Sequence, residues 1–171
     1  MMAFADDLLE QAYHLANKES DNPTQASLRR SVSTAYYALF HLLIDEAVSK
    51  WAVERHRSAL GRTIEHKAMK KVCDDCMKNF YSAGKPESGV KLMNVAQSFA
   101  ILQYRRHTAD YDVSFHWSRT NAIGQIDLAR TAFEDWLAIR SEDAAQDYLL
   151  NLLFPRAAEI MKSSKGESPP S

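Results

Sequence analysis

Glycine and proline are scarce in this chain of 171 residues, with five of each. Alternating runs of β-branched residues are also missing, so the sequence argues against a sheet and predicts an all-helical protein. Apolar residues make up 46% of the chain and charged residues 25%, as in ordinary globular proteins. The chain can therefore bury a hydrophobic core without disulfides or a structural metal ion.

The sequence has neither a strong net charge nor a long apolar run. The formal net charge is -1, so binding to nucleic acid would depend on a local patch rather than on general attraction. No segment approaches the ~20 apolar residues that a membrane span needs. The N-terminal sequence MMAFADDLLEQ is acidic and amphipathic, unlike a signal peptide. We therefore expect a cytoplasmic protein without a membrane partner.

Cysteine is limited to Cys73 and Cys76. A redox role for this pair would need a strand-to-helix setting, which the sequence does not predict here. A zinc site would need two further ligands, and none lies at suitable spacing nearby. We expect both cysteines to extend the apolar face of a helix, and we expect no metal ion or other cofactor.

Apolar residues recur every three or four positions through most of the chain, which predicts amphipathic helices. In the second of these helices Asn22 is suited to the N-cap and Pro23 to the first helical position. Phe40 and Phe99 are predicted core residues of the second and fourth helices. The expected helices span Phe4–Glu19, Pro23–Lys50, Ile64–Tyr81, Val90–Thr108 and Arg119–Arg140.

These segments predict an up-and-down antiparallel bundle of about five helices in residues 1–140. Residues 141–162 should add a C-terminal helix that Pro155 kinks or ends, and residues 163–171 are too polar and proline-rich to fold. Residues 51–63 are expected to form a connection with at most a short helical turn, and residues 82–89 a loop.

Two polar strips interrupt these apolar helices. One strip of the second helix has helical spacing and contains Arg30, Thr34, Tyr37, His41 and Asp45. The fourth helix ends in a second strip, formed by Gln103, Arg106, His107 and Asp110. Polar groups on an otherwise apolar helix must find partners or a ligand. We therefore expect the two strips to face each other in a cleft.

Basic residues gather between Lys50 and Lys71, where seven cations and two carboxylates give a local charge of +5. Such a cluster is typical of a phosphate or RNA contact, and equally of a solvated helix face. The phosphate or RNA candidates are Arg55, Arg57, Arg62, Lys67, Lys70 and Lys71.

Two segments resemble the HEPN domain family. The sequence RRSVSTAYYALFH, from Arg29 to His41, resembles the second-helix signature, in which a basic residue precedes Tyr-Tyr-Ala and an aromatic–His pair. The sequence RRHTADYD, from Arg105 to Asp112, is similar to the segment that closes the fourth helix in many bacterial members. The order and separation of the two segments match the family, and the resemblance covers about residues 4–137.

The resemblance implies a helical bundle that often forms a homodimer near the two motif-bearing helices. Many family members are metal-independent RNases, frequently toxins paired with a nucleotidyltransferase-type antitoxin. Their arginine and histidine lie at the dimer cleft and act on the RNA phosphate and 2′-hydroxyl. Together with the two strips, the resemblance gives as candidate ligand-binding residues Arg30, Tyr37, His41, Arg105, Arg106, His107, Asp110 and Tyr111.

The RNase motif of the family has four to six residues between an arginine and a histidine, and none of the six histidines here meets it. Arg62 and His66 are one residue too close, and Arg106 adjoins His107. An aspartate in place of the histidine cannot act as a base near pH 7 without a large rise in its pKa. We therefore expect a noncatalytic module that binds a nucleotide, RNA or a protein partner.

Three alternatives stay open. The first is an RNase with a rearranged site, in which His107 or His116 acts with Arg105 or Arg106. The second is a metal-dependent hydrolase with ligands from His107, Asp110, Asp112 and His116. The third is a purely structural network that sets helix register and consists of Arg30, Tyr37, His41, Arg106 and Asp110.

Overall fold

The computed structural model describes residues 3–82 and 87–155. Within these residues it is all-helical and has no strand, which confirms the predicted fold class. None of the described helices is both long enough and apolar enough to cross a membrane. The helices are α1 (Ala3–Ala16), α2 (Gln25–Val48), α3 (Glu54–Thr63), α4 (His66–Ser82), α5 (Glu87–Tyr111), α6 (Arg119–Ile139) and α7 (Asp143–Leu153).

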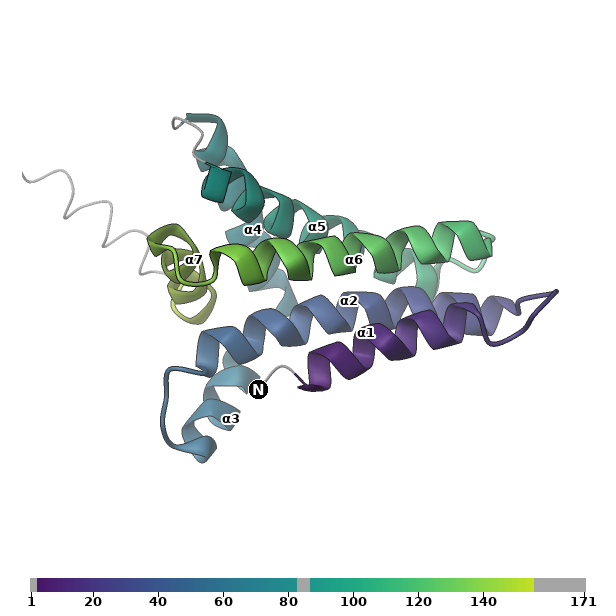
Figure 1. The fold of residues 1–171 in the computed structure, drawn as a ribbon, viewed down its shortest axis with the longest axis horizontal. Coiled ribbons are helices and arrows are strands. Elements are labelled where there is room, and N and C mark those ends of the chain that lie inside the picture. Colours follow the sequence, from purple (N-terminus) through teal and green to yellow (C-terminus); the bar gives the residue numbers. More distant parts are fainter. Residues whose placement is uncertain (1–2, 83–86, 156–171) are drawn as a thin grey trace, which may run out of the picture.

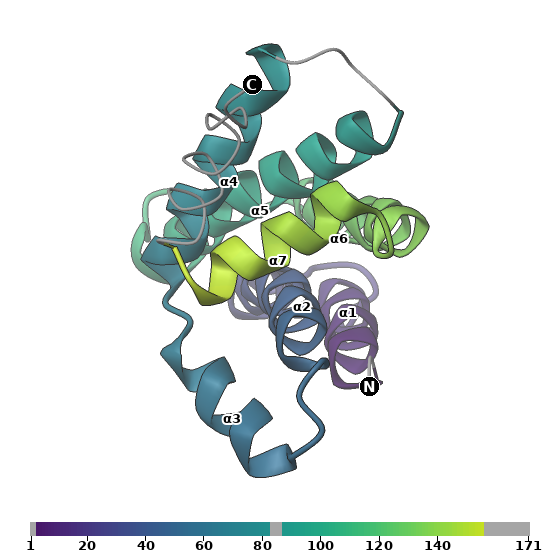
Figure 2. The ribbon, with the colours of Figure 1, turned by 90° about the vertical axis from the view of Figure 1, so that its left-hand side faces the viewer.

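Four helices form an up-and-down bundle: α1 and α2 run in opposite directions, as do α5 and α6 (Figure 1). The helix α2 is central, since it packs on α1, α5 and α6 and also contacts α3 and α7. The helix α4 packs along α5, whereas α3 projects away from the bundle beyond the end of α2 (Figure 2).

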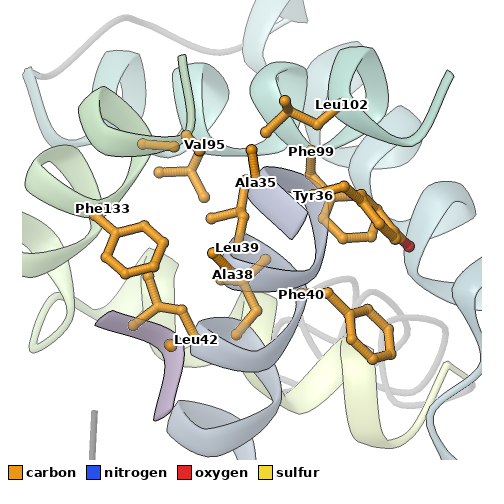
Figure 3. Packing of buried hydrophobic residues seen from close by; sticks show 14 of the residues in the cluster. Ala35, Tyr36, Ala38, Leu39, Phe40, Leu42, Val95, Phe99, Leu102 and Phe133 are labelled. Atoms are coloured by element: carbon orange, nitrogen blue, oxygen red, sulfur yellow. The ribbon is translucent and has the colours of Figure 1, made fainter. Parts of the chain in front are cut away.

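The hydrophobic core surrounds α2. Leu39, Leu42 and Leu43 are fully buried, as expected for a helix that is apolar on most sides. The predicted core positions Phe40 and Phe99 are confirmed, with exposed fractions of 8% and 0%. Figure 3 shows these two rings among the packed side chains of α2, α5 and α6. The core therefore fixes how α2 and α5 are rotated against each other.

The start of α2 differs from the sequence prediction. The N-cap is Thr24, two residues after the predicted Asn22, and Pro23 precedes the helix. The Oγ1 atom of Thr24 accepts a hydrogen bond from the backbone N–H of Ser27 at 3.2 Å, and Glu19 accepts one from the Ser27 hydroxyl at 2.8 Å. The threonine hydroxyl thus satisfies one of the backbone N–H groups that lack a partner in the first turn of a helix. This explains why the N-cap of α2 is Thr24 rather than Asn22.

The helix α3 replaces the predicted connection with at most a short turn. It has ten residues and none of them is buried, so it lacks the apolar stripe that reveals a helix in sequence. Its Gly61 lies close to α2: a Cβ added there would lie 3.3 Å from Cγ2 of Ile44. The small residue therefore allows the two helices to approach each other.

The later elements follow the prediction more closely. Ser118 is the N-cap of α6, and its hydroxyl oxygen accepts a hydrogen bond from the backbone N–H of Asn121 at 3.1 Å. The helix α5 begins at Glu87, inside the predicted loop of residues 82–89, of which 83–86 lie outside the described residues. The helix α7 ends before Pro155 and shares the core through Tyr148 and Leu149. The predicted tail and the end of the C-terminal helix lie outside the described residues.

Cys73 and Cys76 lie on the inward side of α4, as predicted. The Sγ atom of Cys73 lies 3.1 Å from the hydroxyl of the buried Tyr148, so the thiol links α4 to α7. Burial raises the pKa of the Cys73 thiol to about 12 and that of Cys76 to about 11. Both cysteines are therefore protonated near neutral pH and contribute to packing.

Candidate functional site

The centre of the site is Arg106, near the end of α5. Its Nη2 donates a hydrogen bond of 2.9 Å to the hydroxyl of Tyr37 on α2. Its Nε lies 2.9 Å from Oδ2 of Asp110, one turn further along α5. The hydroxyl of Ser33 on α2 donates to Oδ1 of the same carboxylate. We call Ser33, Tyr37, Arg106 and Asp110 the Arg106 site.

The contact between Arg106 and Asp110 is an ion pair without a formed Nε hydrogen bond. Burial opposes the charge on Arg106, but the Tyr37 hydrogen bond and the Asp110 carboxylate outweigh it, and the pKa of the guanidinium is raised. The guanidinium also lies near the aromatic rings of Tyr37 and Tyr111, 5.6 and 5.9 Å from their centroids. The site therefore fixes a cation whose side chain is still 24% exposed.

The imidazole ring of His66 belongs to an aromatic group near Arg106. His66 is the first residue of α4, and its ring stacks on that of Phe40 with centroids 4.1 Å apart. Its Nδ1 lies 2.5 Å from the hydroxyl of Tyr36. Burial, then Arg106, then His41 lower the pKa of His66. The neutral imidazole is therefore favoured.

The polar strip of α2 that faces the end of α5 is displaced by one residue from the predicted strip. Arg29, Ser33 and Tyr37 are spaced by four and all contact the end of α5 or the following loop. The predicted Arg30 is exposed. Of the predicted residues of α2, Tyr37 alone is recorded in contact with Arg106, within the described chain.

His41 contacts α1 instead of α5. Its ring packs edge-on against Phe4, with centroids 4.9 Å apart, and against Phe40 at 5.4 Å. Burial lowers the pKa of His41, and the neighbouring Asp45 partly offsets this. This histidine therefore borders the aromatic group around His66 and packs toward α1 rather than into the Arg106 site.

Three further candidates lie around the Arg106 site on α5. The guanidinium of Arg105 lies 5.8 Å from the ring centroid of the exposed Tyr104. The exposed His107 packs against Tyr111, with ring centroids 4.9 Å apart. Tyr104 and Tyr111 are 66% and 65% exposed, so the outer side of this helix end presents aromatic and cationic groups to solvent.

Arg29 stabilises the end of α5. It belongs to the segment that resembles the family signature, but it was not among the predicted ligand-binding residues. Its guanidinium donates to the backbone carbonyl oxygens of Ala109 and Asp112 at 2.9 Å, and to that of Phe115. These carbonyls belong to the last turn of α5 and the next loop, where helix acceptors are unpaired. Arg29 thus fixes the helix end that carries Asp110.

The basic candidates divide into two groups. Arg57 donates to the backbone carbonyl oxygens of Trp51 and Ala52 at 2.7 and 3.0 Å, so it stabilises the chain before α3. Lys70 forms an ion pair of 2.7 Å with Asp74. The remaining candidates are exposed on α3 and α4 and consist of Arg55, Arg62, Lys67 and Lys71.

The residues of the metal-site hypothesis are engaged elsewhere. Asp110 contacts Arg106 and Ser33, and Asp112 accepts from the backbone and hydroxyl of Ser114 at 3.0 and 2.6 Å. Among residues 3–82 and 87–155, no group of three or more His, Cys, Asp or Glu side chains could hold a metal ion. His116 is exposed in the loop after α5.

A scan against models of protein families found no match to this chain, and searches of curated proteins and of solved structures found none. The class that the fold and site define is an all-helical bundle. Its distinguishing feature is a half-buried arginine fixed between α2 and α5.

Proposed function

We propose that this chain is a HEPN-like module that binds a phosphate-bearing ligand, a nucleotide or RNA, at the Arg106 site. The observation that carries the proposal is the geometry of Arg106, a charged side chain oriented by Tyr37 and Asp110 but 24% exposed. A guanidinium with free N–H groups suits phosphate, which it can bind through two parallel hydrogen bonds. Asp110 then orients the arginine rather than acting as a base.

RNA is favoured over a free nucleotide by the basic surface on the neighbouring helices. The exposed Lys67 follows His66 directly in α4, and Lys71 lies one turn further on. Since α4 packs along α5, a polyanion bound at Arg106 could extend over these cations. Each phosphate that they neutralise would release counterions and make binding dependent on salt.

The proposal is tested by equilibrium binding to the purified protein. We expect a labelled single-stranded RNA to bind more tightly than a nucleoside monophosphate at low salt. Unlabelled RNA should compete, and unlabelled nucleotide should compete more weakly. Absence of binding by both probes at low salt would contradict the proposal.

A charge-reversal experiment tests the basic surface. We expect Arg62→Glu with Lys71→Glu to weaken RNA binding and to lower the slope of log affinity against log salt by about 0.7 for each lost contact to single-stranded RNA. Arg57 is left intact because it binds backbone carbonyls. The control is Lys18→Glu, an exposed position on the chain after α1. Equal slopes of log affinity against log salt in the wild type and both variants would show that the basic residues of α3 and α4 are solvated and do not contact RNA.

A second candidate is a metal-independent RNase with a rearranged arginine–histidine site. The observation that favours it is the position of His66 at the start of α4, stacked on Phe40, where burial first and Arg106 second lower the pKa of the ring. A neutral imidazole beside a fixed cation has the elements needed to deprotonate a 2′-hydroxyl and to stabilise a phosphate. RNA cleavage that persists with a chelator and disappears in His66→Gln would support this candidate over simple binding.

The partners that we propose follow from the same resemblance. A homodimer would pair near α2 and α5, where Tyr104 and Tyr111 are exposed and of a type enriched in interfaces. A nucleotidyltransferase-type antitoxin is the proposed protein partner. Sedimentation of the wild type beside Tyr104→Glu tests the dimer, and a nucleotidyltransferase-like neighbouring reading frame would support a toxin–antitoxin origin.

A further inference from the structure

His66 connects the first turn of α4 to two other helices. Its ring lies between α4 and α2, stacked on Phe40 at 4.1 Å with the planes inclined by 24°. Its Nδ1 contacts the hydroxyl of Tyr36 at 2.5 Å, and its backbone carbonyl accepts from Nε2 of Gln103 on α5 at 3.0 Å. One residue thus makes three separate contacts that place α4 against the bundle.

The surroundings of the ring disfavour a positive charge. Tyr36 is fully buried and Phe40 is 8% exposed, so the ring is largely removed from water on that side. On α5, Arg106 is already a cation, and on α2 His41 adds a further titratable group. The ring also lies at the N-terminus of α4, where the helix dipole is unfavourable to cations.

The other polar groups near the ring do not reverse this. Tyr37 packs edge-on to His66, with ring centroids 6.2 Å apart, and its hydroxyl accepts a hydrogen bond from Arg106. Asp110 is engaged with Arg106. Glu65 and Lys67, the chain neighbours of His66, have exposed side chains.

We propose that His66 is a proton-sensitive contact, which fixes the first turn of α4 to α2 and α5 while the ring is neutral and releases it when the ring is protonated. Release would also affect the Arg106 site, since Gln103 lies one turn before Arg106 on α5 and Tyr36 adjoins Tyr37 on α2. This effect on ligand binding rests on the proposed function, whereas the contact itself does not.

The direction of the pH effect follows from the lowered pKa of His66, whose ordinary value is 6.5. Above pH 6.5 the ring is neutral in both folded and unfolded protein, and the contact contributes fully. As the pH falls below 6.5, the unfolded chain takes up the proton first, and stability decreases. Mild acid should therefore loosen the contact of α4 with α2 and α5.

The test is an NMR titration of ligand-free protein from pH 8 to about pH 5, following the ring nitrogens of His66 and the backbone amides of residues 67–72. We expect His66 to titrate with a midpoint below 6.5 and the α4 amides to shift with the same midpoint. In His66→Gln, which keeps a neutral polar side chain, that amide transition should be absent. In His14→Gln, an exposed histidine on α1, it should remain.

A midpoint at or above 6.5, or α4 amides that stay constant while the ring titrates, would overturn the proposal. If His66→Gln does not fold, the titration of the wild type decides alone. The experiment contains no ligand, so a failure of phosphate binding at Arg106 leaves its outcome unchanged. Conversely, a negative titration leaves the proposed binding site untouched.

Discussion

Arg106→Ala should abolish binding of RNA and nucleotide while lowering the free energy of unfolding only modestly. The guanidinium is the charged group that the Arg106 site orients toward solvent, and alanine removes both its charge and its hydrogen-bonding fork. The loss of stability is modest because Tyr37 and Asp110 both retain access to water once the arginine is gone; the Asp110 side chain is already 21% exposed. Binding is measured by fluorescence anisotropy and stability by urea denaturation.

Two variants serve as controls for this experiment. Arg105→Ala removes an adjacent arginine whose guanidinium lies beside the exposed Tyr104, and it should weaken binding far less. Asp110→Asn keeps the size of the side chain but removes its charge, so Arg106 loses orientation and binding should fall by an intermediate amount. If Arg106→Ala and Asp110→Asn instead each destabilise the fold by roughly 3–5 kcal/mol, the network is structural, as for a broken buried ion pair.

Phe99→Ala should cost about 3–5 kcal/mol of stability, through lost transfer free energy and the cavity that remains. Phe99 is fully buried on α5, and its ring centroid lies 5.4 Å from that of Tyr36 on α2. For a domain of this size each 1 kcal/mol shifts the melting temperature by about 2–4 °C. We therefore expect the melting temperature to fall by roughly 10 °C, measured by differential scanning calorimetry.

The matched control is Tyr13→Ala on α1, which truncates an aromatic side chain that is 48% exposed and has no part in the proposed dimer. Its melting temperature should stay close to that of the wild type. A Phe99→Ala protein that melts together with the Tyr13→Ala protein would show that α5 does not pack on α2 through this ring.

Most helices could be predicted because their apolar faces have a helical period. The buried positions Phe40 and Phe99 follow directly from that period. The helix α3 could not be predicted in this way, since it buries no residue and its position depends on contacts with α2. The N-cap at Thr24 was missed because its hydrogen bonds with Ser27 and the nearby Glu19 depend on the conformation of the turn before α2.

The candidate site was predicted in part. The contact between Tyr37 and Arg106 was expected from two polar strips that must satisfy each other. The roles of Arg29 and Ser33 were missed because two neighbouring faces of α2 both have polar residues at helical spacing. The sequence does not tell which face points to α5, since the packing of the bundle fixes the rotation of the helix. A closer signal existed: Arg29, Ser33 and Tyr37 recur at intervals of four residues.

His66 illustrates what sequence spacing cannot supply. Its contacts come from Tyr36 and Phe40, which precede it by 30 and 26 positions, and from Gln103 on a third helix. In the sequence it lies near the start of the predicted helix Ile64–Tyr81, and the spacing of that helix does not indicate which other helices it contacts. The tertiary arrangement of α2, α4 and α5 is therefore required to place an imidazole beside Arg106.

The most direct test of the Arg106 site is to observe its guanidinium during a titration. The side-chain Nε–H signals of the arginines are followed by NMR as RNA or a nucleoside monophosphate is added to the wild type. We predict a saturable shift at Arg106 and none at Arg130, which is paired with Asp127 on α6. A saturable shift elsewhere with Arg106 unchanged, or no shift at any arginine at low salt, would contradict phosphate binding at this site.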